Sequence, residues 1–137
     1  MKQILQSNKY MFVFDLKNIG GRSASQLFGK VYIFKKNSPY DCTYDFDISS
    51  ANSIAPNVEY SWHYEHPDVN TNLPPHWVII GIKYSDPITK SDYSEIFYCQ
   101  WEGIKNDILY SNISSVTIPK KELLKEKYKN YLSQYLQ

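Results

Sequence analysis

The chain has 137 residues, enough for one domain with a buried core, and a formal net charge of +1, which provides no field to attract duplex nucleic acid. No apolar run approaches the roughly 20 residues that span a bilayer, and the N-terminus lacks the apolar core of a signal peptide. We therefore expect a single domain, residues 1–137, in the cytoplasm. The alternative location is the inner face of the membrane, reached through an anchor missing from this chain or through the basic C-terminus.

From the N-terminus onward, the chain predicts seven short strands followed by one helix. Alternating apolar and polar residues mark the strands, and Gly, Pro, Asn and Asp mark the turns. The expected strands are Tyr10–Lys17, Ser23–Phe34, Tyr40–Ile48, Val58–Tyr64, Val78–Tyr84, Tyr93–Trp101 and Ile108–Ile118. Asn18–Gly21 is a strong turn signal, because Asn and Gly tolerate positive φ.

The stretch Val78–Trp101 predicts a β-hairpin at the centre of a sheet. Both faces of both strands are partly apolar, which favours a central position over an edge. Gly81, in the middle of the first strand, indicates either a bulge or the close approach of a bulky neighbour. We expect this hairpin to form the core and not to act in catalysis.

The C-terminal segment, residues 119–137, predicts an amphipathic helix. Leu124, Tyr128, Tyr131 and Tyr135 recur at helical spacing, and Pro119 suits the first turn. We expect the helix to close the open side of the sheet. Because five lysines surround this stripe, the alternatives are self-association into a homo-oligomer and contact with anionic lipid.

Short strands separated by turns indicate a mainly β domain built as an antiparallel sandwich over residues 10–118. A small closed β-barrel is the alternative topology, because strand content and number do not separate the two.

Two motifs resemble those of small bacterial immunoglobulin-like domains. In the segment DLKNIGGRSA, Asp15–Ala24, a strand runs into a turn and a second strand starts at a small residue; Gly81–Asp86, GIKYSD, is similar to a later strand of those domains. The resemblance covers about residues 10–101 and implies an immunoglobulin-like β-sandwich. Many such domains follow transmembrane helices in uncharacterised proteins, and the family supplies no catalytic residues.

The order Cys42, Trp62, Cys99 is similar to the Cys–Trp–Cys order of antibody-type variable domains. That likeness implies a disulfide between Cys42 and Cys99. The long gap from Cys42 to Trp62, and Phe97 in place of the expected Tyr, depart from that pattern. The alternative is that both thiols are buried and behave as small hydrophobic groups.

Two groups of polar residues are candidates for chemistry. His63, Glu65 and His66 offer ligand types that zinc prefers, although the helical spacing of the usual motif is absent and exposed loop histidines are the alternative. The second group is the acidic set Asp41, Asp45 and Asp47, which alternates with aromatics and indicates the wet face of an edge strand. We expect no cofactor.

The ligand-binding candidates are mainly aromatic side chains near the loop that follows residue 64, together with the single arginine. They are Arg22, Trp62, His63, Tyr64, His66 and Trp77. Aromatic rings next to a loop can stack a base or a sugar, whereas core packing equally explains Trp62. For Arg22, an anion contact competes with a solvated turn position.

These patterns predict a non-catalytic binding or sensor module, the soluble part of a membrane-associated bacterial protein, with a protein partner or small ligand that the sequence does not identify. We predict a non-catalytic role because the sequence shows a clear β core but no set of three polar residues that would converge on one site. One alternative is a ligand-gated effector domain of a bacterial defence system, holding a cyclic oligonucleotide in an aromatic-lined cavity. The other is a metal-dependent hydrolase that uses His63, Glu65 and His66.

Overall fold

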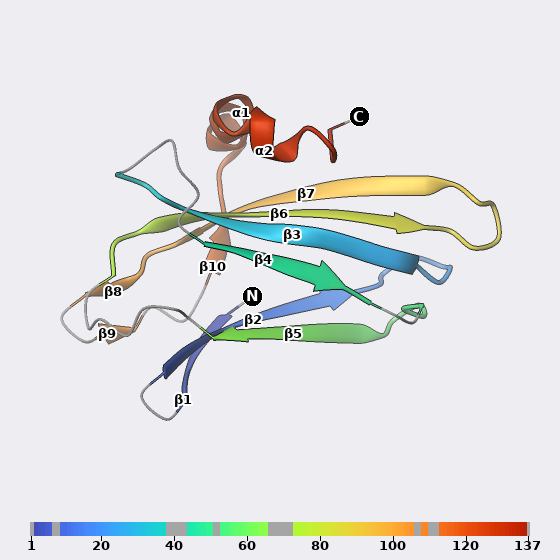
Figure 1. Ribbon diagram of the computed structural model, residues 1–137, viewed down its shortest axis with the longest axis horizontal. Helices are drawn as coiled ribbons and strands as arrows, with labels where there is room; N and C mark the ends of the chain where they lie inside the picture. Colours follow the sequence, from blue (N-terminus) through green and yellow to red (C-terminus); the bar gives the residue numbers. More distant parts are fainter. Residues whose placement is uncertain are drawn as a thin grey trace.

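A computed structural model describes most of the chain as two antiparallel β-sheets with short helices at the C-terminus (Figure 1). The described residues are 2–6, 9–37, 44–50, 53–65, 73–105, 108–109 and 113–136. None of the helices within these ranges is long and apolar enough to cross a membrane.

The larger sheet has five strands in the order β10-β7-β6-β3-β4. These strands are β3 (Ser25–Lys35), β4 (Tyr44–Ser49), β6 (His76–Ser85), β7 (Asp92–Trp101) and β10 (Ile113–Ser115). Strands β6 and β7 pair without a register shift from His76↔Trp101 to Ser85↔Asp92. The predicted hairpin is therefore confirmed. Strand β6 has a partner on each side, whereas within the described residues β7 has its second partner, β10, only over residues 99–101.

The smaller sheet has three strands in the order β1-β2-β5, namely β1 (Lys2–Gln6), β2 (Lys9–Lys17) and β5 (Glu59–Glu65). The sequence did not predict β1. A two-stranded ladder, β8 (Ile104–Lys105) and β9 (Ile108–Leu109), lies apart from both sheets. The expected strand Ile108–Ile118 is therefore wrong as one element, because it divides into β9, β10 and the start of a helix.

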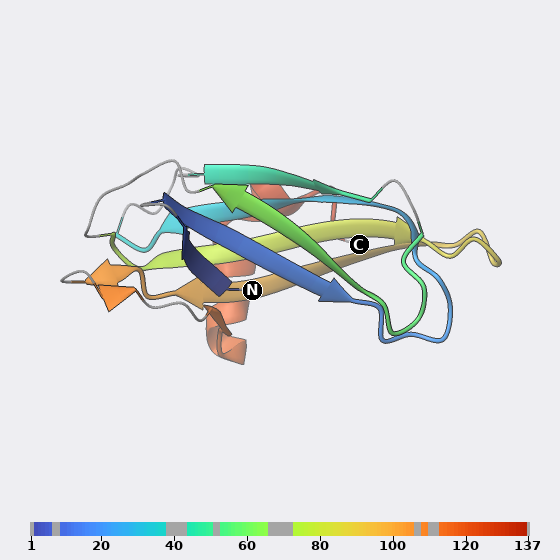
Figure 2. The same cartoon turned by 90° about the horizontal axis from the view of Figure 1, so that it is seen from below.

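The two sheets pack face to face around an inner hydrophobic cluster (Figure 2). Alternate residues of the central strands point into it, among them Val31, Ile33, Val78 and Ile80, and β2 contributes Phe14. No described strand belongs to both sheets. The closed-barrel alternative is therefore wrong. A barrel would need hydrogen bonds between the edge strands of the two sheets, and the described strands pair only within their own sheet.

The opposite face of the five-stranded sheet carries a second cluster, covered by α1 (Ile118–Lys127) and α2 (Lys129–Leu132) (Figure 1). The ring of Phe34 stacks on that of Tyr128 at 3.8 Å between centroids. The expected closing helix is confirmed with Pro119 in its first turn, but it breaks at Tyr128 and ends at Leu132. The remaining contacts of this layer come from the turn that contains Tyr135.

Candidate functional site: an open pocket between the sheets

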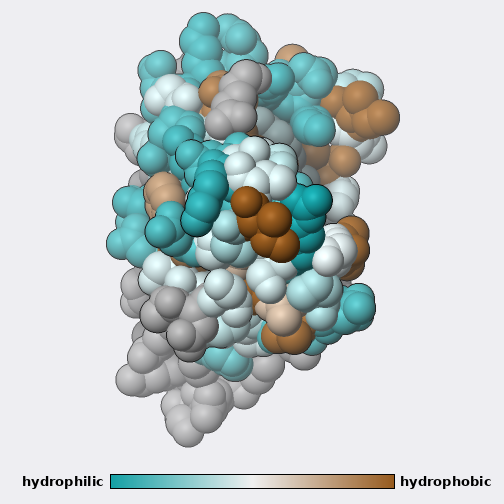
Figure 3. Space-filling view, turned by 90° about the vertical axis from the view of Figure 1, so that its right-hand side faces the viewer, coloured by the Kyte–Doolittle hydropathy of each residue, from teal (hydrophilic) through white to brown (hydrophobic). Residues whose placement is uncertain are grey.

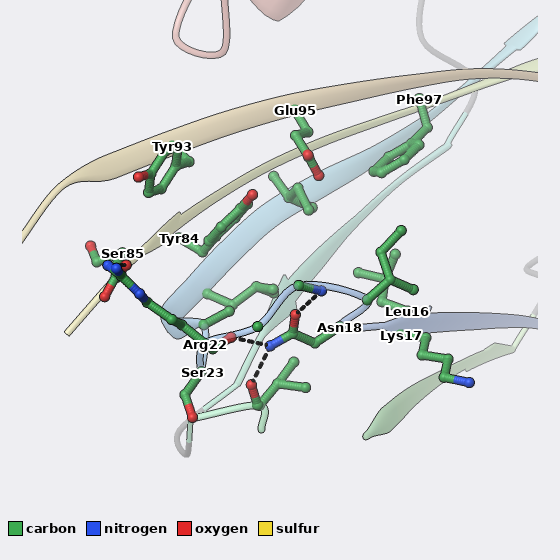
Figure 4. Close-up of a pocket in the computed structure, with 18 residues that line it drawn as sticks. Leu16, Lys17, Asn18, Arg22, Ser23, Tyr84, Ser85, Tyr93, Glu95 and Phe97 are labelled. Carbon is green, nitrogen blue, oxygen red and sulfur yellow. Dashed lines mark hydrogen bonds and ion pairs between the residues drawn. The ribbon is translucent and has the colours of Figure 1, made fainter. Parts of the chain in front are cut away.

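A pocket of about 720 Å³ opens between the two sheets at one end of the molecule (Figure 4). Its lower wall is the end of β2 and the loop of residues 18–24, and its upper wall is the inner face of β6 and β7. Figure 3 looks onto this end, where hydrophobic side chains stand among polar ones. Ile19 and Ile88 are among the exposed apolar residues of the two turns found here.

The pocket exists because the smaller sheet does not cover all of the larger one. Strand β1 pairs with β2 only over residues 9–13, so within the described part of the chain the end of β2, residues 14–17, has a ladder partner on its β5 side alone. Beneath the covered part of β7, Trp101 is fully buried. Beneath the uncovered part, Tyr93 is 44% exposed and Phe97 38% exposed, although both point toward the inner layer.

The loop that forms the lower wall is held by the side chain of Asn18. Its Nδ2 donates hydrogen bonds to the carbonyl oxygens of Arg22 (2.7 Å) and Ile54 (2.8 Å), and its Oδ1 accepts one from the Gly20 amide (3.0 Å). This local pattern is an Asx-type turn, which short polar side chains stabilise. The expected turn at Asn18–Gly21 is therefore confirmed, and its bonds fix the rim of the pocket.

Arg22 does not present a free cation to the pocket. Its Nη1 lies 2.8 Å from Oδ2 of Asp86, whose side chain is largely buried. The Asp86 carboxylate also accepts hydrogen bonds from the backbone amides of Ile88 and Thr89. The Arg22 hydrogen bond and these amides hold the pKa of Asp86 below its usual value. The pair ties the loop before β3 to the turn between β6 and β7.

The upper wall is aromatic with one carboxylate in its middle. Tyr84 and Tyr93 are cross-strand partners whose rings stack at 5.5 Å between centroids. Glu95 and Phe97 follow Tyr93 on the same face of β7, and in Figure 4 the Glu95 carboxylate points into the pocket. Burial and the nearby Glu95 carboxylate both raise the pKa of Tyr84.

Sequence reasoning missed this wall. The expected strand Tyr93–Trp101 contains both Tyr93 and Phe97, but the whole hairpin was expected to form the core. The available signal was Glu95, a charged residue that lies between them on an otherwise apolar face. An isolated charge on such a face indicates that part of it reaches solvent.

Of the predicted ligand-binding residues that the structure describes, Arg22 alone lines this pocket; His66 lies outside the described residues. Trp62 and Tyr64 instead join β5 to the edge of β4: Trp62 Nε1 donates a hydrogen bond to the Ser49 carbonyl oxygen at 3.0 Å, and the Tyr64 hydroxyl donates one to that of Asp47. Both side chains are partly buried against the inner cluster. Their positions agree with the core alternative for Trp62.

Trp77 lies on the other side of the five-stranded sheet, buried in the outer cluster. The ammonium groups of Lys36 and Lys120 lie over its ring, at 4.2 Å and 5.3 Å from the centroid. Because the ring is enclosed by the helix layer and two lysines, it offers no platform for a ligand in this structure. We therefore do not include Trp77 in the candidate site.

The proposed metal ligands are only partly described. His63 is exposed on β5, whereas His66 and the side chain of Glu65 lie outside the described residues. Among the residues that are described, no group of three His, Cys, Asp or Glu is arranged to hold a metal ion. The metal site at His63, Glu65 and His66 stays a prediction.

The acidic set and the cysteines are also only partly described. Asp45 and Asp47 are exposed on β4, which is an edge strand as expected, and Lys30 Nζ lies 3.5 Å from Asp47 Oδ1; Asp41 lies outside the described residues. Cys99 is a free cysteine in this structure. Cys42, like Asp41, lies outside the described ranges. Burial raises the pKa of the Cys99 thiol, which makes it a poor nucleophile at neutral pH.

No protein-family model, curated protein or solved structure matches the chain. The pocket between the sheets remains the feature in which exposed aromatic rings, a carboxylate and fixed loops come together. Chemically, such a site can enclose a small molecule and orient it through one charged contact.

Proposed function

We propose that this chain is a non-catalytic binding module, an immunoglobulin-like β-sandwich that holds a small ligand in the pocket between the β2–β3 loop and β7. The observation that carries the proposal is the aromatic wall of that pocket, where Tyr93 and Phe97 remain exposed inside a space of about 720 Å³. Small-molecule sites are mostly apolar clefts of about 300–1,000 Å³ with a few polar groups. Leaving these rings uncovered costs hydrophobic free energy that a ligand would recover.

The charges of the pocket support binding better than acid–base catalysis. Asp86 and Arg22 neutralise each other, so Glu95 is the carboxylate of the lining that lies outside an ion pair, and it shares a hydrogen bond with the Tyr84 hydroxyl. General acid–base catalysis works best with a group whose pKa lies near the working pH, whereas burial and the Glu95 carboxylate raise the pKa of Tyr84 further above neutrality. The link to membrane-associated bacterial proteins rests on the family resemblance alone and stays a prediction.

A cyclic oligonucleotide is the second candidate ligand, because the stacked pair Tyr84 and Tyr93 offers a ring face on which a base can lie. The charges are less favourable for it. The Arg22 guanidinium is already paired with Asp86, and Glu95 would repel phosphate. Cyclic dinucleotides therefore belong in the test panel as a competing class.

The test is a thermal-stability screen against small neutral, cationic and anionic compounds and cyclic dinucleotides, followed by mapping of amide chemical shifts by NMR. A ligand at a hundred times its dissociation constant adds about 2.7 kcal/mol to the free energy of unfolding. We expect at least one compound to stabilise the protein and to shift the amides of β7 around Phe97.

The matched variants are Phe97→Ala, in the pocket, and Tyr60→Ala, an aromatic residue of β5 that is about as exposed but lies outside the pocket. We expect the first to abolish the ligand-induced stabilisation and the second to keep it. No stabilising compound in any class, or stabilisation that survives Phe97→Ala unchanged, would overturn the proposed function.

A further inference from the structure

We propose that the ligand of this pocket is a small organic cation, an alkyl-substituted ammonium group held against Glu95 and flanked by the rings of Tyr93 and Phe97. The inference rests on the proposed binding function and assigns the chemical class of its ligand.

The charges of the pocket lining favour a cation. Four charged residues line the pocket: Lys17, Arg22, Asp86 and Glu95. Arg22 and Asp86 form an ion pair, and the Lys17 ammonium points away from the pocket in Figure 4. Within the described part of the chain, no lysine or arginine forms an ion pair with Glu95. With the Lys17 ammonium turned outward, the Glu95 carboxylate is the charge of this lining that no ion pair neutralises, although the Tyr84 hydroxyl shares a hydrogen bond with it, and a cation would complement that charge.

Aromatic rings lie on both sides of that charge along β7. Tyr93, Glu95 and Phe97 are successive residues on one face of β7, so their Cα atoms follow one another at about 7 Å along the strand. A cation within about 6 Å of a ring centroid is attracted by the negative face of the ring. An ammonium group that lies between the Glu95 carboxylate and either ring therefore contacts both the negative charge and that ring.

The part of the wall opposite Glu95, on β6, is mainly apolar and aromatic. Ile82 is its direct cross-strand partner, and Tyr84 lies diagonally across from it on β6. Ile82 is buried and apolar, and the Glu95 carboxylate is close enough to raise the pKa of the Tyr84 hydroxyl. These neighbours suit alkyl groups on a cation better than a hydrated metal ion, because they offer ring and methyl surface and not oxygen ligands.

The experiment compares choline with its neutral isostere, in which carbon replaces the ammonium nitrogen, by isothermal titration calorimetry and NMR titration on the full chain. We expect choline to bind at least about tenfold more tightly, which corresponds to about 1.4 kcal/mol. The Glu95→Gln variant should remove that preference and leave binding of the neutral compound unchanged. The control Glu122→Gln, an exposed position on α1, should keep it.

A second variant distinguishes the effect of the aromatic π face of Phe97 from the effect of its apolar bulk. Phe97→Leu keeps an apolar side chain but removes the π face, so it should weaken choline more than the neutral compound. A peptide that carries trimethyl-lysine distinguishes the source of the cation. Tighter binding of the peptide than of choline points to a side chain of a partner protein, and tighter binding of choline points to a free metabolite.

The outcomes separate this inference from the function on which it rests. Equal binding of choline and its neutral isostere, or a choline preference that survives Glu95→Gln, overturns the cation and leaves the binding module standing. Binding of an anionic compound at β7 in place of choline does the same. If no compound of any class binds, both proposals fall.

Discussion

At the scale of single residues, Gly81 shows how one position without a side chain can shape a layer. It lies in the middle of β6 on the outer face of the sheet, and the ring of Tyr135 packs directly over it. A Cβ atom built there would overlap the Tyr135 ring. Of the two interpretations that the sequence allowed, the close approach of a bulky neighbour is therefore confirmed, because β6 pairs with β7 through Gly81 without a register shift.

Gly81→Ala is expected to destabilise the protein by about 1–3 kcal/mol, because overpacking forces Tyr135 out of the outer cluster. Urea denaturation followed by circular dichroism measures the change. Gly21→Ala is the control, since a Cβ there meets no atom within 4 Å. In the Gly81→Ala background, truncating Tyr135 should cost less than it does in the parent protein. A Gly81→Ala variant as stable as the Gly21→Ala control would contradict this packing.

The ion pair between Arg22 and Asp86 makes the free energy of unfolding depend on pH. The pKa of Asp86 is lowered in the folded protein, so the unfolded chain takes up its proton first as the pH falls. Its stabilising contribution is therefore complete above the ordinary value near 3.8 and is lost as the pH falls through the lower folded value.

We expect Asp86→Asn to be less stable than the parent protein near neutral pH, with a difference that shrinks as the pH falls below about 4. Arg22→Gln should show the same trend, because it removes the other half of the pair. Urea midpoints measured between about pH 7 and pH 2 test both variants. A difference that stays constant over this range would show that the ion pair does not exist in solution.

At the scale of elements, β3 and β6 serve two clusters at once. Val31 and Ile33 point to the inner cluster while Tyr32 and Phe34 point to the outer one, as the two-residue period of a strand requires. The outer face of the sheet is apolar, and α1, α2 and the following turn cover it and remove it from water. The C-terminal helices are therefore part of the fold and not an appendage.

Two neighbouring leucines of α1 test this role. Leu124 is 1% exposed and packs in the outer cluster, whereas Leu123 is 63% exposed. We expect Leu124→Ala to lower the free energy of unfolding by about 2–5 kcal/mol, as deletion of a buried leucine usually does. Leu123→Ala should change it by less than about 0.5 kcal/mol. Equal effects in urea denaturation would mean that the helix does not dock through this face.

At the scale of the whole molecule, the pocket follows from the unequal coverage of one sheet by another. The larger sheet has five strands, and the smaller has three, one of which pairs with only half of β2. The uncovered strip of β7 carries Tyr93, Glu95 and Phe97, and the ion pair at Asp86 closes the end of the site. A site made in this way belongs to no single motif, since its walls come from both sheets.

Much of the secondary structure could be predicted because its signals are local. Alternation along Val78–Trp101 encodes the hairpin, Asn18–Gly21 encodes a turn, and the spacing of Leu124 and Tyr128 encodes the helix. Strand β1 was missed because Lys2–Gln6 has no clear alternation. The helix break at Tyr128 was missed because nothing in its helical spacing marks it.

The sequence by itself determined which residues are apolar on which face of each strand, because side-chain direction depends only on the local backbone period. Only the tertiary structure decided which of those faces are covered. Tyr93 and Trp101 lie on the same face of β7, yet one is exposed in a pocket and the other is fully buried. Burial depends on the strand that lies opposite, and that partner comes from a distant part of the chain.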